Sequence, residues 1–138
     1  MAEMFKFEIY TPYRLFYSQD VQCVIVTIAD GDIGIYAHHS IFTAPVKTCA
    51  MRIKGRNGEW LDVFVAEGVI EVKKNKTVLL VDSANFPEEI DIERVRLAKE
   101  KAESIIKDKS FKYESQQAQK DLRRAEVRLA LFEKLKKQ

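Results

Sequence analysis

The chain has 138 residues, which allows one domain or a small domain with an appendage. Its 23 basic and 21 acidic side chains give a net charge of +2. This balance argues against a dedicated nucleic-acid-binding protein, which usually has a clear basic excess. No apolar run approaches the roughly 18–20 residues that span a bilayer, and the N-terminus lacks a basic segment followed by an apolar one. We therefore expect no signal peptide, and a soluble protein that meets a membrane only through a partner.

The segment from Asn85 to Asp91 divides the chain by composition. All five Gly precede it, and the last of the three Pro, Pro87, lies within it. Because Gly and Pro mark turns and are avoided inside helices, we predict a β domain over residues 1–86 and a helical domain over residues 87–138. Residues 112–138 carry 8 basic and 4 acidic side chains, so the last helix has a charge of +4 and favours an acidic partner surface.

The N-terminal part has the pattern of many short strands separated by turns. Alternating or continuous apolar residues predict strands over residues 5–10, 14–17, 20–29, 33–36, 41–46, 48–54, 59–66, 69–72 and 76–81. The run at 20–29 suits a strand covered on both faces, and Gly34 inside a strand suggests a bulge or a close backbone approach. Cys23 and Cys49 have apolar neighbours and are expected to be buried free thiols. This part is predicted to be a β sandwich or flattened barrel.

The C-terminal part has the pattern of two helices. Asp91 is a good N-cap for the first, whose apolar stripe is Val95, Ala98, Ala102, Ile105 and Ile106. Residues 107–110 form a short polar connection, with Ser110 as a cap for the second helix. The second apolar seam steps by four and three residues through Ala118, Leu122, Ala125, Leu129 and Phe132. We therefore predict an antiparallel helical hairpin, an α+β chain as a whole, and a hairpin whose small apolar face makes it marginally stable alone.

Sequence motifs for catalysis are absent. The chain has no Gly-rich phosphate loop and no Cys/His pattern with metal spacing, and its two His are adjacent, His38 and His39. We predict a non-catalytic protein that requires no cofactor.

Several motifs, taken in order, resemble the epsilon subunit of bacterial F-type (rotary) ATP synthases, and the similarity covers essentially the whole chain. The most distinctive is Gly31-Asp32-Ile33-Gly34-Ile35-Tyr36, with His39 after two intervening residues. The other matching stretches are Tyr10-Thr11-Pro12, Ala44-Pro45, Glu67-Gly68-Val69-Ile70-Glu71 and Ile90-Asp91-Ile92-Glu93-Arg94. The last stretch is similar to the Ile/Leu-Asp-x-x-Arg-Ala motif that opens the family's C-terminal hairpin.

The resemblance implies a central-stalk subunit of a proton-translocating ATP synthase, peripheral on the cytoplasmic side of the cell membrane. The β domain would join the gamma subunit to the polar loops of the c-ring, with Asp32 and His39 at that interface. The hairpin would switch between a state folded on the β domain and a state extended along gamma. The extended hairpin would inhibit ATP hydrolysis by placing its last helix among the alpha and beta subunits, with the basic face of Arg123, Arg124 and Arg128 against an acidic beta-subunit segment.

In some family members ATP binds as a regulatory ligand and holds the hairpin down. This implies Ile90, Asp91 and Arg94 as candidate ATP-binding residues. A Glu that helps to hold ATP in those members falls near Asn85 here. Two later Arg that hold its phosphates align with Leu131 and Leu135, although Arg124 and Arg128 lie close by.

The chain also departs from the family in its loops. His38 and Ile41 stand where the family usually has Gly and Pro around the loop His. Ala66-Glu67-Gly68 replaces a Gly-Gly or Ser-Gly-Gly, and Val95 replaces the Ala of the hairpin motif. Loop contacts to gamma or to the ring are therefore expected to differ.

Each candidate residue also has a plain structural interpretation. Asp32 suits a turn, His39 a hydrogen-bonded loop, and Asp91 an N-cap. Arg94 suits an exposed first helical turn, and the three later Arg suit a solvated helix face. Two other functions stay open: an ATP-sensing module whose hairpin closes on nucleotide, and a free-standing scaffold whose hairpin binds other coiled-coil partners.

Overall fold

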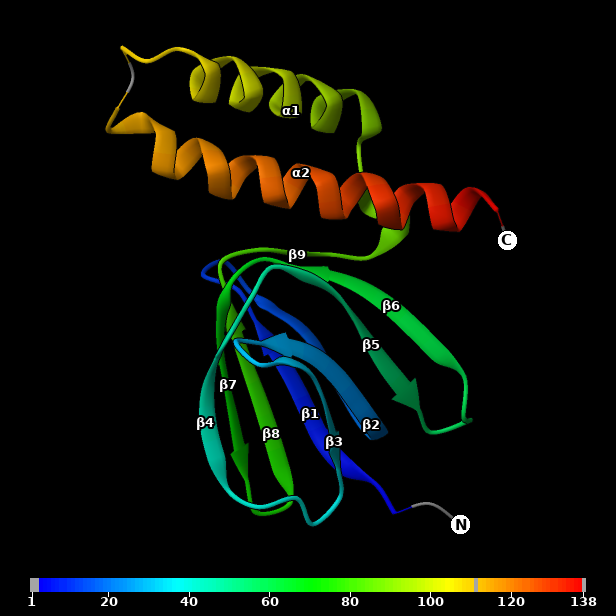
Figure 1. Ribbon diagram of the computed structural model, residues 1–138. Coiled ribbons are helices and arrows are strands. Elements are labelled where there is room, and N and C mark those ends of the chain that lie inside the picture. The colour runs from blue at the N-terminus through cyan, green and yellow to red at the C-terminus, as the bar shows by residue number, and fades with distance from the viewer. Residues whose placement is uncertain (1–2, 111, 138) are drawn as a thin grey trace. The chain divides into compact units, whose positions relative to one another are not determined.

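The strands end at Asn85 and the helices follow, which divides the chain into the units Met1–Asn85 and Phe86–Gln138 (Figure 1). The structure is a computed structural model that describes residues 3–110 and 112–137. The first unit contains β1 (Phe5–Tyr10), β2 (Leu15–Ile28), β3 (Gly31–Tyr36), β4 (Phe42–Val46), β5 (Cys49–Gly55), β6 (Trp60–Val65), β7 (Gly68–Lys73), β8 (Lys76–Val81) and β9 (Ala84–Asn85). The second contains the 3₁₀ helix η1 (Pro87–Glu89), α1 (Ile92–Lys107) and α2 (Glu114–Lys136).

The strands of the first unit are linked in the order β4-β7-β8-β1-β2-β5-β6-β9, and β3 also pairs with β2. The β1–β8 pair is parallel, and the other pairs are antiparallel. β2 pairs first with β1 and then with β3 and β5, so this one strand passes from one part of the sheet to the other. The predicted order of strands followed by two helices is confirmed.

The two strands predicted at residues 14–17 and 20–29 are one strand, β2. The polar run from Ser18 to Asp20 looks like a break, but it continues the ladder with β1. The register shifts between Val21 and Cys23, where pairing passes to β5. Beyond this shift Ile25 is partly exposed, so the prediction of a strand covered on both faces is wrong for this half.

The core of the first unit consists of apolar side chains from most of its strands. The largest that are fully buried are Phe7, Phe64, Ile9, Ile35, Met51, Ile53, Ile70 and Leu79. Complete burial of such a side chain contributes about 1.5–3 kcal/mol each relative to exposure. Cys23 and Cys49 are buried free thiols, as predicted.

One carboxylate is buried where β1 meets β8. The Glu8 side chain is 8% exposed and lies 2.8 Å from Lys76 Nζ, and Ser18 Oγ donates to it at 3.2 Å. The hydrogen bond from Lys76 lowers the pKa of Glu8 below its usual value. Its contribution to stability is therefore present above the unfolded pKa of the carboxyl, and is lost as the pH falls through the lowered folded pKa.

Two Gly positions are explained by close packing. A Cβ at Gly68 would lie 1.9 Å from the backbone oxygen of Leu80, so the β7–β8 pair leaves no room for a side chain there. A Cβ at Gly34 would lie 3.3 Å from the Tyr36 ring. β3 pairs with β2 without a register shift at Gly34, so the close approach predicted there involves a side chain, and no bulge is present.

The second unit is an antiparallel pair of helices (Figure 1). Asp91 is the N-cap of α1, as predicted, because its Oδ1 accepts a hydrogen bond from Arg94 N at 3.3 Å. Val95 and Ala102 are buried, whereas Ala98 is exposed, so its place in the predicted stripe is wrong. On α2 the buried residues are Ala118, Ala125, Val127 and Leu131.

The cap predicted for the second helix is also wrong. α2 begins at Glu114, after Tyr113, and not at Ser110. The Ser110 hydroxyl and backbone N–H both donate to Asp108 Oδ1, at 2.6 and 3.0 Å. The acidic side chain two residues earlier therefore engages Ser110 in a local turn, in competition with a helix start.

Candidate functional sites

Asp32 lies at the start of β3, next to the tip of the β2–β3 hairpin. Gly31 before it has φ +117°, a conformation that favours Gly. Thr27 Oγ1 on the paired strand donates to Asp32 Oδ1 at 2.6 Å. The carboxylate is exposed but held in place, so Asp32 is both a turn residue and an available contact point.

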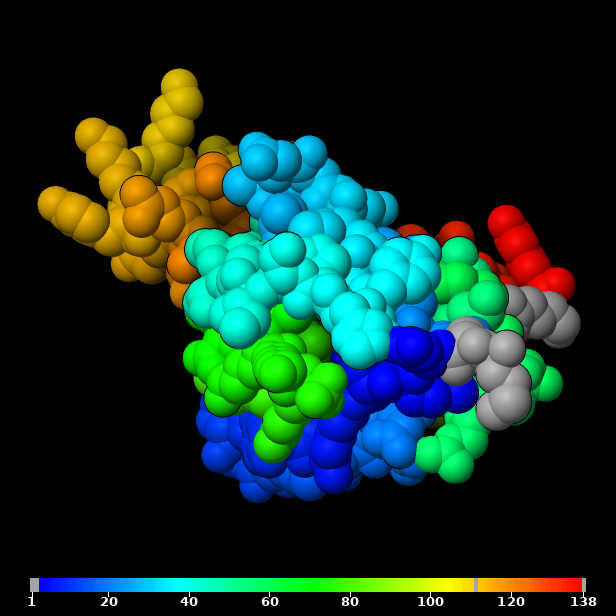
Figure 2. All heavy atoms as spheres, turned by 90° about the horizontal axis from the view of Figure 1, so that it is seen from below, coloured from blue at the N-terminus to red at the C-terminus, as the bar shows by residue number. Residues whose placement is uncertain are grey.

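The two His lie in the loop after β3. His38 has φ +64°, and its ring contacts the Glu3 carboxylate. This left-handed conformation gives a physical reason for a Gly at the same place in the family. In Figure 2 the cyan surface of this loop lies beside the blue surface of the first strand, in agreement with the contact.

The His39 ring makes two contacts, one with Ser40 and one with Phe42. Its Nδ1 lies 3.0 Å from the Ser40 carbonyl oxygen, and its ring centroid lies 5.2 Å from that of Phe42. Asp32 is near the beginning of β3, while His39 follows its end. The structure therefore does not bring these two predicted residues together, and each stays a separate candidate for a partner contact.

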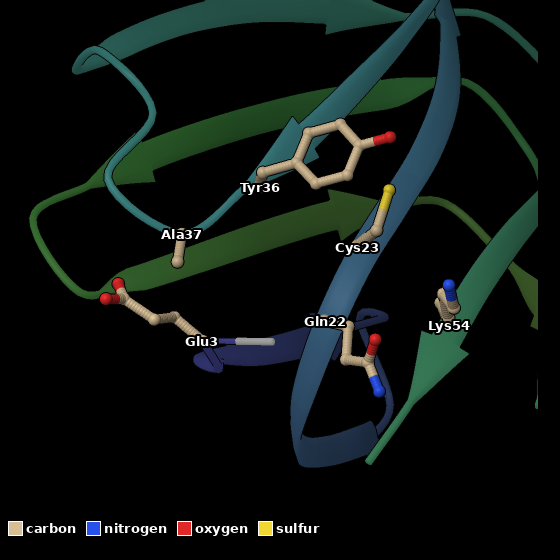
Figure 3. A pocket seen from close by; sticks show the side chains of 6 residues that line it. All are labelled: Glu3, Gln22, Cys23, Tyr36, Ala37 and Lys54. Atoms are coloured by element: carbon tan, nitrogen blue, oxygen red, sulfur yellow. The ribbon is translucent and has the colours of Figure 1, made fainter. Parts of the chain in front are cut away.

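A hollow of about 320 Å³, which the sequence did not indicate, lies on the first unit (Figure 3). Its lining residues are Glu3, Gln22, Cys23, Tyr36, Ala37 and Lys54. A hydrogen bond between the Tyr36 hydroxyl and the Cys23 thiol raises the pKa of Tyr36 above its usual value. The pairing register of β2 with β3 and β5 places Cys23, Tyr36 and Lys54 together, although these three are far apart in sequence.

Three Arg of the second unit form a cluster. Arg94 is in the first turn of α1, and Arg124 and Arg128 are one turn apart on α2. Burial lowers the pKa of Arg128 below its usual range, and the charges of Arg124 and Arg94 lower it further. The antiparallel pairing of the helices therefore brings Arg94 of α1 and Arg124 of α2 within electrostatic reach of Arg128.

The three Arg of the predicted basic face differ in their exposure to solvent. Arg123 is exposed, whereas Arg124 and Arg128 are partly buried. At about 100° per residue, Leu131 and Leu135 fall on the same side of α2 as Arg124 and Arg128. Leu131 and Leu135 thus lie on the same face of α2 as Arg124 and Arg128, but nearer to its C-terminus. The charges of Arg124 and Arg94 both act on Arg128. Ile90 is buried just before the Asp91 cap.

The described residues were also searched for a metal site and for a membrane-spanning helix. Within residues 3–110 and 112–137, no three His, Cys, Asp or Glu side chains gather so that they could hold a metal ion. No helix in the same part of the chain is long and apolar enough to cross a membrane.

The first unit and the hairpin each match a known family model. Residues 4–87 match the ATP synthase delta/epsilon chain beta-sandwich domain, and residues 88–133 match the long alpha-helix domain of the same chain. The chain belongs to the ATP synthase delta/epsilon family. The predicted resemblance and fold class are confirmed.

Similar proteins and structures cover nearly the whole chain. The ATP synthase epsilon chain of Caldanaerobacter subterraneus subsp. tengcongensis is 38% identical over 97% of both chains. That of Caldicellulosiruptor saccharolyticus is 39% identical over 96% of both. A chain of the Euglena gracilis mitochondrial ATP synthase covers 92% of this chain and 80% of its own length, with a TM-score of 0.78 at 17% identity. A chain in the central stalk and c-ring of the Tetrahymena thermophila enzyme covers 95% and 98%, with a TM-score of 0.63 at 14% identity. These two structures share the fold.

Proposed function

We propose that this epsilon-family chain is a non-catalytic subunit of the ATP synthase central stalk. The observation that carries the proposal is the match of both units, in order and over nearly the full length, to ATP synthase epsilon chains. The β unit joins gamma to the c-ring on the cytoplasmic side of the membrane, and its attachment to the membrane goes through the complex. Asp32 and His39 are two of its contact points with gamma and the ring.

The helical hairpin is the regulatory part of the proposed function. The inner faces of the helices bury Ala102, Ala118 and Ala125, which allow close approach but remove little apolar area from water. Such a pair can be separated at modest cost, as a movable element requires. In the extended state, α2 places Arg123, Arg124 and Arg128 against an acidic surface of the alpha and beta subunits and blocks ATP hydrolysis.

Binding to gamma tests the stalk assignment directly. The full chain, immobilised through an N-terminal tag, is expected to retain purified gamma subunit from the same ATP synthase after washing with physiological salt. The tag alone is the control. Gamma that passes over the full chain without retention would contradict the stalk assignment.

A second candidate function, ATP sensing by the closed hairpin, is favoured by the cluster of Arg94, Arg124 and Arg128. Guanidinium groups bind phosphate oxygens through paired hydrogen bonds, and the three charges here lie near one another on facing helices. A triphosphate between α1 and α2 would join the helices and favour the closed state. A ligand shifts such an equilibrium only as far as its affinities for the two states differ. Asp91 and Ile90 precede α1 and are the other proposed contacts.

We expect Arg128→Gln to weaken ATP binding by about 10-fold or more, because it removes a charged hydrogen bond worth about 1.5–3 kcal/mol. Arg123→Gln removes the same charge from an exposed position and is expected to leave ATP affinity nearly unchanged. Calorimetric titration of the full chain with millimolar ATP measures both. If wild-type chain gives no binding heat and no chemical-shift change, this second candidate is wrong. Equal losses in the two variants would remove the Arg cluster as the site.

A further inference from the structure

Three Lys lie side by side at one end of three neighbouring strands of the β unit. Lys73 on β7 pairs with Lys76 on β8, and Lys76 pairs with Lys6 on β1. Residues that pair across strands point to the same face of a sheet. Lys6 and Lys73 are exposed, as is Lys74 in the β7–β8 turn, and Lys76 is partly exposed. We name these four residues, Lys6, Lys73, Lys74 and Lys76, the lysine row.

The lysine row is held by two carboxylates on the same face. Cross-strand pairs of like charge destabilise a sheet, so the row requires compensation. Glu71 on β7 and Glu8 on β1 provide it, because both pair with Val78 of β8, two residues from the Lys pairs. Lys73 Nζ lies 3.6 Å from Glu71, and Lys76 Nζ lies 2.8 Å from Glu8. Each of these two Lys therefore has an acidic partner within the chain.

The other two Lys have charges that the chain does not neutralise in the same way. Lys6 pairs in the register with Asp20 of β2, but Asp20 Oδ2 lies 2.9 Å from Arg56 Nη2. Among the described residues no ion pair involves Lys6 or Lys74. Four Lys and two Glu leave this end of the sheet with a charge of +2. The surface therefore favours an anion from another molecule.

An exposed apolar side chain lies at the same end of the sheet. Phe42 of β4 pairs with Val72 of β7, so Ile41 and Lys73 each lie one residue beyond this pair. Ile41 is 73% exposed. In Figure 2 the green surface of the β7–β8 turn lies beside the cyan surface of the β3–β4 loop and the blue surface of β1. Cationic and apolar side chains thus gather at one end of the β unit.

This combination fits the surface of a membrane that contains anionic phospholipids. Lys side chains near such a surface are attracted by its negative potential. An apolar side chain beside them can enter the boundary between the headgroups and the acyl chains, which adds buried apolar area to the charge attraction. A nucleic acid or a free phosphate would match the charges, but neither offers an apolar layer for Ile41.

We propose that the lysine row binds the phosphate groups of anionic phospholipids, with Ile41 at the boundary between headgroups and acyl chains. The inference rests on the proposed function for its setting, because the complex brings the β unit to the membrane. A few Lys and one apolar side chain give weak, reversible binding, so attachment still goes through the complex. The lysine row adds a direct contact with lipid to that attachment.

Flotation of the full chain with lipid vesicles, in the absence of any other protein, tests the inference. Vesicles of phosphatidylcholine alone are compared with vesicles of equal parts phosphatidylcholine and phosphatidylglycerol at physiological salt. We expect binding to the anionic vesicles and none to the neutral ones. Lys74→Glu reverses an exposed charge and is expected to weaken binding by roughly tenfold or more. Ile41→Ser is expected to weaken it by about fivefold, because less apolar area is buried.

Lys47→Glu is the matched control. Lys47 is exposed and follows Val46, which pairs with Gly68 at the opposite end of β4 and β7. The charge change is the same as in Lys74→Glu, and the basic helix α2 is unchanged in both variants, so Lys47→Glu is expected to bind as the wild-type chain does. Inorganic phosphate at unchanged ionic strength is not expected to displace the chain from the vesicles.

The outcomes separate this inference from the proposed function. Equal affinities of Lys74→Glu and Lys47→Glu, or binding that does not depend on phosphatidylglycerol, would overturn the inference. Displacement by inorganic phosphate would also overturn it, because free phosphate would then be the ligand. A chain that retains gamma but does not float with anionic vesicles loses the lipid contact alone, and the stalk assignment stands. A chain that floats but does not retain gamma keeps the lipid site, and the stalk assignment is wrong.

Discussion

Replacement of Gly68 by Ala is expected to lower the free energy of unfolding of the β unit by about 3 kcal/mol, at the upper end of typical overpacking costs. The added Cβ would lie 1.9 Å from the Leu80 carbonyl oxygen and 2.8 Å from Val81 Cα. These are backbone atoms of β8, which pairs with β7 at this point, so they can move only if ladder hydrogen bonds are strained. Urea unfolding followed by Trp60 fluorescence measures the loss.

Gly55→Ala provides the control. A Cβ at Gly55 would make its nearest contact at 3.5 Å, an ordinary van der Waals distance, so we expect a change within about 0.5 kcal/mol, typical of uncritical surface sites. Equal stability losses at Gly68 and Gly55 would show that close approach is not what selects Gly in the Glu67-Gly68 motif.

Replacement of Ala125 by Leu is expected to shift the hairpin toward its open state by about 1–3 kcal/mol, the usual cost of overpacking. Ala125 is 1% exposed and belongs to the α2 seam, where a larger side chain separates the helices. A shift of this size changes the ratio of closed to open hairpin by roughly 5–150-fold. Hydrogen exchange of the α1 amides, residues 92–107, is expected to accelerate accordingly.

Ala130→Leu adds the same side chain at an exposed position of α2 and should leave exchange unchanged. In the reconstituted enzyme, the open Ala125→Leu hairpin is expected to inhibit ATP hydrolysis more strongly than the wild-type chain does. If the α1 amides exchange hydrogen at similar rates in both variants, packing at the Ala125 seam does not control the separation of the two helices.

The sequence predicted most of the fold because the local signals agree with the final structure. The absence of Gly and Pro after Pro87 separates helix from strand, and Asp91 caps α1 as expected. The sequence predictions were wrong where a polar residue could take part in more than one local structure. Ser110 bonds to Asp108 and does not cap α2, and the polar residues within β2 look like a loop although they continue a ladder.

The candidate sites were less predictable because they depend on pairing between distant segments. The cluster of Arg94, Arg124 and Arg128 requires the helices to fold back at one particular register, which residue spacing along a single helix does not specify. The lysine row requires the register of three strands. A one-residue shift in any pair would send alternate side chains to the opposite face.

The measurement that tests the account most directly is ATP hydrolysis by the alpha–beta–gamma head, with the full chain and with a chain that ends at Pro87. We predict that both chains bind the head, that the full chain lowers the hydrolysis rate, and that truncation restores it. The rate should recover because the truncated chain lacks α1 and α2, and with them the basic residues Arg123, Arg124 and Arg128. Binding of both chains with equal rates of hydrolysis would contradict the regulatory role of the hairpin.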